Sequence, residues 1–82
     1  MRKIFRTPVP VSTRALVQRI NRKLKAEESV LKASRGARAQ QDLGDYYLLD
    51  WRTNAVHAKD VDPEDLGREL GVLKAWERVL DE

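Results

Sequence analysis

Basic side chains recur at helical spacing in the first third of the chain, in a pattern suited to binding phosphate. The residues of this line are Arg14, Gln18, Arg22 and Lys25. Their separations of four, four and three residues place them along one side of an α-helix. Cations arranged in this way can neutralise several phosphates together, and each neutralised phosphate releases counterions. The residues predicted to widen the line into a patch are Arg19, Lys23, Arg35 and Arg38.

The charge of the whole chain supports this interpretation, because it is divided unevenly. Residues 1–41 hold eleven Lys/Arg against two Asp/Glu, a net charge of +9, whereas residues 42–82 hold five against eleven, a net charge of −6. Such asymmetry predicts a polyanionic or acidic partner for the first half. The leading hypothesis is a small non-enzymatic module that contacts nucleic-acid phosphates. The alternative is an accessory protein that docks on an acidic protein partner or self-associates into a homo-oligomer.

The residue types that perform catalysis or hold metals form no recognisable motif. The chain has no cysteine and one histidine, His57, so neither a disulfide nor a zinc site is predicted. The serines lack a recognisable nucleophile setting, the acidic residues do not follow calcium-loop spacing, and the glycines form no phosphate-binding loop. We therefore predict no enzymatic activity, no cofactor and no metal.

Tyr46 is the candidate for a contact on the sheet. It precedes Tyr47 in a predicted strand, and neighbours in a strand point to opposite faces. If Tyr47 and Trp51 face the helices, Tyr46 and Leu48 lie on the other face. There Tyr46 could stack on a base, form a contact patch between copies with Leu48, or be partly buried under the neighbouring basic loop.

The elements that must position these residues begin with an extended basic arm, residues 1–11, and an amphipathic helix, residues 13–26. Prolines at positions 8 and 10 prevent a helix in the arm. Ser12 is predicted to cap the helix that follows. The apolar side of that helix consists of Ala15, Leu16, Val17, Ile20 and Leu24.

Three strands are predicted in the middle of the chain, over residues 30–35, 46–51 and 55–59. Asn54 lies in the turn between the last two, where it tolerates positive φ. Val56 and Ala58 are predicted to face the core. Residues 36–43 fit either a mobile basic loop or a short helix, and we favour the loop because Gly36 and Gly44 bracket the segment.

The last predicted elements are helical. The run Asp62-Pro63-Glu64-Asp65 combines an N-cap, a proline suited to the first helical position and charges that the helix dipole favours. Gly71 suits a left-handed position at the end of that helix. Leu73, Trp76 and Leu80 then have the spacing of a short second helix or helical tail.

Together these elements predict an α+β fold of order α-β-β-β-α in a single domain, residues 12–82. Its three-stranded antiparallel meander packs against the N-terminal amphipathic helix and the C-terminal helix. With no apolar run near 18 residues, no membrane-spanning helix is predicted, and a cytoplasmic location is expected.

Residues 13–73 also resemble a family of short bacterial proteins without assigned function, found in chromosomes, plasmids and phages. The segments that carry this resemblance are residues 15–24, 42–47, Asn54 and residues 66–73. The resemblance implies no activity, substrate or site. The element order matches double-stranded-RNA-binding domains as well. We do not assign that family, because acidic residues 62–65 occupy the start of the last helix, where those domains carry phosphate-binding lysines.

Overall fold

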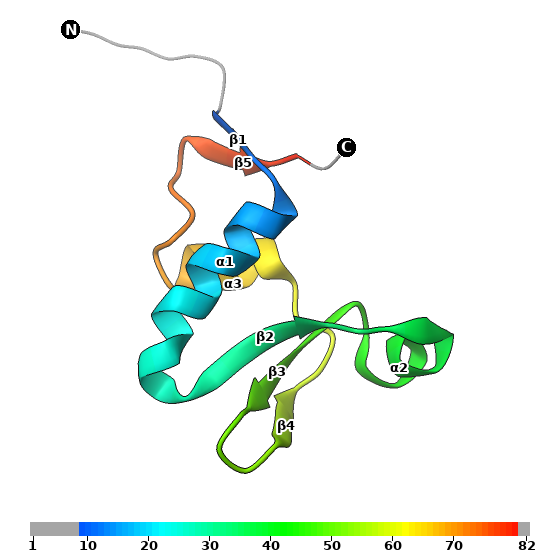
Figure 1. Ribbon diagram of the computed structural model, residues 1–82. Coiled ribbons are helices and arrows are strands. Elements are labelled where there is room, and N and C mark those ends of the chain that lie inside the picture. The colour runs from blue at the N-terminus through cyan, green and yellow to red at the C-terminus, as the bar shows by residue number, and fades with distance from the viewer. Residues whose placement is uncertain (1–8, 81–82) are drawn as a thin grey trace, which may run out of the picture.

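Residues 9–80, which the computed structural model describes, form an α+β fold with an antiparallel sheet of order β2-β3-β4 (Figure 1). Its elements are β1 (Val9–Val11), α1 (Thr13–Leu24), β2 (Ser29–Ala33), α2 (Gly36–Leu43), β3 (Tyr46–Asp50), β4 (Ala55–Ala58), α3 (Pro63–Glu69) and β5 (Glu77–Val79). A 3₁₀ turn, Lys25–Glu27, follows α1. The predicted fold class is confirmed: α1 packs against α3 and against β2. The structure also contains a small parallel pair of strands, β1 and β5, that was not predicted.

Helix α1 begins and faces the core as predicted. The Ala15 N–H donates to Ser12 Oγ at 3.1 Å, so the serine caps the first turn. Leu16 and Ile20 are fully buried, and Leu24 is nearly so. The helix ends two residues before the predicted boundary, because the chain tightens into the 3₁₀ turn. This apolar stripe leaves the opposite side of α1 exposed.

Helix α3 also begins and ends at the predicted signals. Asp62 Oδ1 accepts the Glu64 N–H at 3.0 Å, and Pro63 occupies the first turn. At the other end Gly71 has a φ of +76°, and the Val72 N–H donates to the Gly67 carbonyl at 2.9 Å in a Schellman-type ending. A Cβ on Gly67 would lie 2.8 Å from Leu16 Cδ1. Glycine at this position therefore permits the close approach of α3 to α1.

The prediction of which β3 face meets the core is wrong. Leu48 pairs with the buried Leu31, and both Tyr46 and Leu48 pack against the core cluster. Tyr47 and Leu49 therefore lie on the outer face, and Trp51, just beyond β3, is 50% exposed. The run Tyr-Tyr-Leu-Leu is apolar on both faces, so alternation could not distinguish them.

The return strand β4 also differs from the prediction, because it contains a β-bulge. Leu49 pairs with Val56, whereas Leu48 pairs with Ala58, so β4 has one extra residue, His57, in a β-bulge. Val56 is consequently 43% exposed instead of facing the core. The turn before β4 is as predicted, and Asn54 has a φ of +62°.

Two further segments correct the sequence prediction. Residues 36–43 form helix α2 instead of a mobile loop, and the Asp60 N–H donates to the Leu43 carbonyl at its C-terminal end. The predicted helical tail is an extended segment containing β5, whose Val79 pairs with Val11 of β1. Val11 belongs to the buried core. The part of the predicted arm that is described, Val9–Val11, is thus part of the domain, and residues 1–8 lie outside the described residues.

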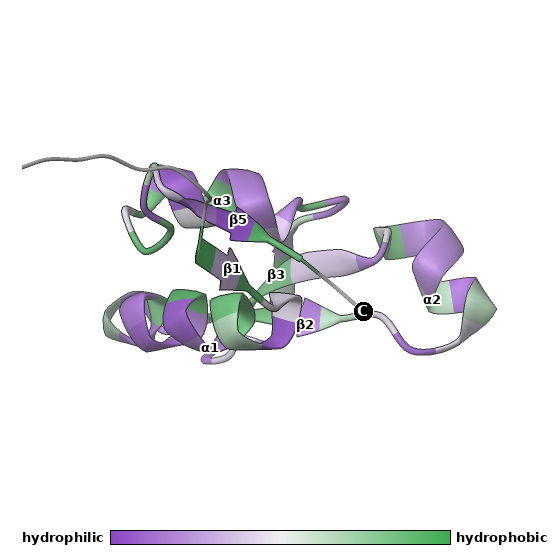
Figure 2. Ribbon diagram, turned by 90° about the horizontal axis from the view of Figure 1, so that it is seen from above, coloured by the Kyte–Doolittle hydropathy of each residue, from purple (hydrophilic) through white to green (hydrophobic). Residues whose placement is uncertain are grey.

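Seen from above, α2 lies apart from α1 and α3, at the far end of β2 and β3 (Figure 2). None of its residues is buried. Within residues 9–80, no helix has the length and apolar character needed to span a membrane.

Candidate nucleic-acid interface

The predicted basic line lies on the exposed side of α1. Arg14, Gln18 and Arg22 are all exposed, as is Lys25 in the turn that follows. Their position follows from the register of the helix, since Leu16, Ile20 and Leu24 occupy the buried side. Arg22 and Lys23 lie in the last turn, where positive charge is favoured by the helix dipole. The structure therefore brings the four side chains of the predicted line, Arg14, Gln18, Arg22 and Lys25, to one accessible surface.

A groove extends this surface beyond α1. It has a volume of about 470 Å³ and lies between the C-terminal half of α1 and the chain that follows α3. The residues that line it are Arg19, Arg22, Lys23, Gly71, Val72 and Lys74. A Cβ on Gly71 would meet nothing within 4 Å, so the glycine leaves this wall open. Four cationic residues thus surround one concave surface.

Lys74 is the residue of this groove that sequence reasoning missed. The spacing of its apolar neighbours predicts a helical tail there, remote from the basic line. The Lys74 N–H instead donates to Glu77 Oε1 at 2.9 Å, and the Arg68 guanidinium donates to the Lys74 carbonyl at 3.2 Å. These contacts fix the turn to α3 and to β5, and the contacts of Arg19 with Val72 and Glu77 hold it beside α1. No local sequence signal relates Lys74 to α1, because about fifty residues separate them.

Arg19 differs from the other predicted cations, because its side chain binds within the protein. Its Nη1 donates to Glu77 Oε1 at 2.9 Å and to the Val72 carbonyl at 3.0 Å. The Glu77 side chain is only 10% exposed. This contact joins α1 to β5 and partly neutralises Arg19. Arg19 therefore forms a wall of the groove, and the more exposed cations remain the candidates for phosphate contact.

The ion pair also predicts a pH dependence of stability. The hydrogen bond from Arg19, with a second from the Lys74 N–H, lowers the pKa of Glu77. Since the folded pKa lies below the unfolded value of about 4.3, the pair stabilises the fold above that pH and loses its effect as the pH falls through the folded pKa. We expect Glu77→Gln to lower Tm at pH 7, and this deficit to shrink by pH 3.

Calorimetry at both pH values measures this difference. Glu64→Gln is the matched control, because it removes the exposed Glu64–Arg68 pair of α3. Exposed pairs contribute little to stability, so the control should change Tm only slightly at either pH. An unchanged Tm for Glu77→Gln at pH 7 would contradict the role assigned to this pair.

Arg35 and Arg38 do not join the basic face of α1. Arg35 immediately precedes α2 and Arg38 lies within it; both are exposed. Because α2 lies apart from α1, these arginines form a separate basic site at the far end of the molecule (Figures 1 and 2). The single wide patch predicted from the sequence is therefore divided in two.

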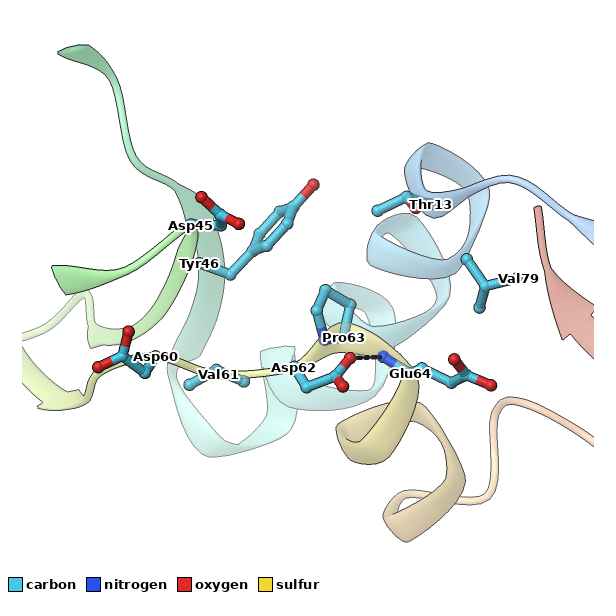
Figure 3. A pocket seen from close by; sticks show the side chains of 9 residues that line it. All are labelled: Thr13, Asp45, Tyr46, Asp60, Val61, Asp62, Pro63, Glu64 and Val79. Carbon is cyan, nitrogen blue, oxygen red and sulfur yellow. Dashed lines mark hydrogen bonds between the residues drawn. The ribbon is translucent and has the colours of Figure 1, made fainter. Parts of the chain in front are cut away.

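Tyr46 faces a cleft instead of the outer sheet surface. The cleft has a volume of about 480 Å³. Its lining residues are Thr13, Asp45, Tyr46, Asp60, Val61, Asp62, Pro63, Glu64 and Val79 (Figure 3). The Tyr46 ring extends toward Pro63 and Thr13 (Figure 3). Four carboxylates line the same cleft, so Tyr46 is poorly placed to stack on a base of a polyanion.

His57 has a polar contact with Ser29. Its Nε2 lies 3.3 Å from Ser29 Oγ, and the same hydroxyl lies 3.3 Å from the Glu27 carbonyl. In residues 9–80, no carboxylate is hydrogen-bonded to His57, so an orienting group for a general base is missing from this contact. The same part of the chain contains no cluster of three or more His, Asp or Glu residues placed to hold a metal ion.

No protein-family model, curated protein or solved structure matches this chain. The family resemblance therefore stays a hypothesis, and the interpretation of the site depends on its geometry and charge.

Proposed function

We propose that this protein is a small binding module that contacts nucleic-acid phosphates through α1 and the adjoining groove. The observation that carries the proposal is the convergence of exposed cations from two distant segments: Arg22 and Lys23 from α1, and Lys74 from the turn after α3. Arg14 and Lys25 extend the same surface along the helix. Cations grouped in this way can contact several phosphates at once.

The composition of this surface favours phosphate contact with little reading of bases. Arginine offers a planar fork that binds phosphate oxygens in pairs, and lysine acts as a compact charge. Gln18 is the uncharged member of the line, and an isolated glutamine has limited power to select a sequence. We therefore expect similar affinities for unrelated sequences of the same length and form.

Lys74 provides a specific test, because its role depends on the folded groove. Lys74→Ala should weaken duplex-DNA binding and reduce the magnitude of the log–log salt slope by about 0.9, the value for one lost phosphate contact. Fluorescence anisotropy of a labelled duplex of about 20 base pairs at several salt concentrations measures both effects.

The matched control is Lys59→Ala, which removes another exposed lysine with the same change in net charge. Lys59 lies outside the groove. Equal slopes for the two variants would show that only net charge matters, and the groove would lose its proposed role.

A further inference from the structure

The two edges of the three-stranded sheet differ in how they are covered. At the β2 edge, the Asn21 side chain donates through Nδ2 to the Leu31 carbonyl at 3.2 Å. Its Oδ1 accepts the Leu31 N–H at 2.7 Å. The amide thus forms both hydrogen bonds that a neighbouring strand would form at this residue. Covering an exposed edge in this way prevents pairing with another chain.

The β4 edge has no such cover. The Trp51 N–H donates to the Glu28 carbonyl, which precedes β2. Because backbone groups alternate in direction along a strand, the odd-numbered residues of β3 form their hydrogen bonds with β2. The even-numbered residues direct their backbone groups to β4. Asp50 is opposite Ala55, which leaves the backbone groups of Val56 directed to the open side. Among residues 9–80, nothing forms a hydrogen bond with that side of Val56. A strand edge of this kind can accept a further strand.

An apolar row ends at the same edge. Val30, Leu49 and Val56 are cross-strand partners on the outer face of β2, β3 and β4. This is the face opposite to the one that packs against α1. Val56 is the most exposed of the three, since it forms the end of the row. A partner at β4 would therefore cover exposed apolar surface as well as unpaired backbone groups.

We propose that the β4 edge binds β4 of a second copy, antiparallel, about a two-fold axis perpendicular to the sheet. The product is a six-stranded sheet with the order β2-β3-β4-β4′-β3′-β2′. A second copy fits because two identical rows become continuous and because Ala55–Ala58 carries no charge when His57 is neutral.

The area available for this contact is small. Two four-residue strands with their adjoining side chains bury on the order of 400 Å² per copy, about half of a standard interface. We therefore expect a weak, transient dimer. The two-fold axis places both α1 helices on one side of the joined sheet. If the proposed function holds, the dimer presents two phosphate-binding faces together, although the pairing itself does not depend on nucleic acid.

Sedimentation velocity of the full chain without nucleic acid tests the proposal, over roughly 5 µM to 1 mM protein. The mass should rise from that of the 9.5 kDa monomer toward twice that value. Val56→Pro removes the outward N–H and should hold the protein monomeric throughout, whereas Tyr47→Lys, on the outer face of β3 but outside the apolar row, should still dimerise. A monomer at every concentration overturns the proposal, as does a dimer that survives Val56→Pro.

Single-cysteine variants provide a second measurement that does not rely on proline. The chain has no cysteine, so each variant carries one reporter. Under mild oxidation, Val56→Cys at the β4 edge should form disulfide-linked dimers at least about 10-fold faster than Lys32→Cys on β2. Equal rates at the two edges overturn the pairing.

Discussion

Replacing Arg14, Arg22 and Lys25 together by Glu should reduce nucleic-acid affinity by roughly 100-fold or more at 0.15 M salt. Each side chain is exposed, so the fold should remain intact. The substitutions remove three candidate phosphate contacts and replace them with repulsive charges. Since nonspecific affinities are only about 10⁻⁴–10⁻⁶ M at this salt, such a loss makes binding undetectable. Anisotropy with duplex and single-stranded oligonucleotides measures the effect, and circular dichroism checks the fold.

The control for this prediction keeps the net charge equal. Its three substitutions to Glu are at Lys32, Lys59 and Arg78, which are exposed and lie off α1. Both triple variants change the net charge of the chain from +3 to −3. If both lose affinity equally, binding reflects overall charge, and the basic face of α1 has no special role.

Leu16→Ala should strongly destabilise the fold, with a loss of about 2–5 kcal/mol in the free energy of unfolding. Leu16 is fully buried, and its Cδ1 faces Gly67 where α1 and α3 approach closely. Truncation leaves a cavity between the two helices, and the glycine has no side chain to fill it. Urea denaturation followed by circular dichroism measures the change.

Leu49→Ala is the matched control for the core. Both substitutions remove the same atoms, but Leu49 lies on the outer face of the sheet, away from the core cluster. We expect its cost to be below about 1.5 kcal/mol, because a partly exposed side chain loses less burial. Equal losses for the two variants would contradict the assignment of the sheet faces.

The parts of the fold that follow from local signals were predicted correctly. Ser12 caps α1 and Asp62 caps α3 because each side-chain oxygen binds a backbone N–H within the next three residues. Gly71 and Asn54 adopt positive φ for equally local steric reasons. Such features depend on a few neighbouring residues, so the amino-acid sequence contains all the information needed to recognise them.

The incorrect predictions concern contacts between distant segments. Val11 and Val79 pair across most of the chain, and no local pattern distinguishes β5 from the helical spacing of Leu73, Trp76 and Leu80. The orientation of β3 depends on the pairing of Leu48 with Leu31. Helix α2 ends where the Leu43 carbonyl accepts the Asp60 N–H, a contact to a residue in a later loop.

In the candidate site, too, the features set by local sequence were predicted and those set by distant contacts were not. The line from Arg14 to Lys25 follows from helical periodicity alone, and the structure places it on one exposed surface. Arg19 is engaged within the protein because its side chain binds Glu77. Lys74 lines the groove because the turn after α3 places it beside α1. Both depend on how β5 returns to β1, so the sequence pattern could not reveal them.

Titration of the unmodified protein against a labelled duplex of about 20 base pairs, from roughly 50 to 300 mM salt, measures whether the basic face of α1 and the groove bind phosphates. If Arg14, Arg22, Lys23, Lys25 and Lys74 each contact a phosphate, the plot of log affinity against log salt should be linear with a slope of about −4.5. Affinity should be independent of base sequence. Absence of binding at the lowest salt concentration, or an affinity that does not change with salt, would contradict the proposal that this surface binds nucleic-acid phosphates.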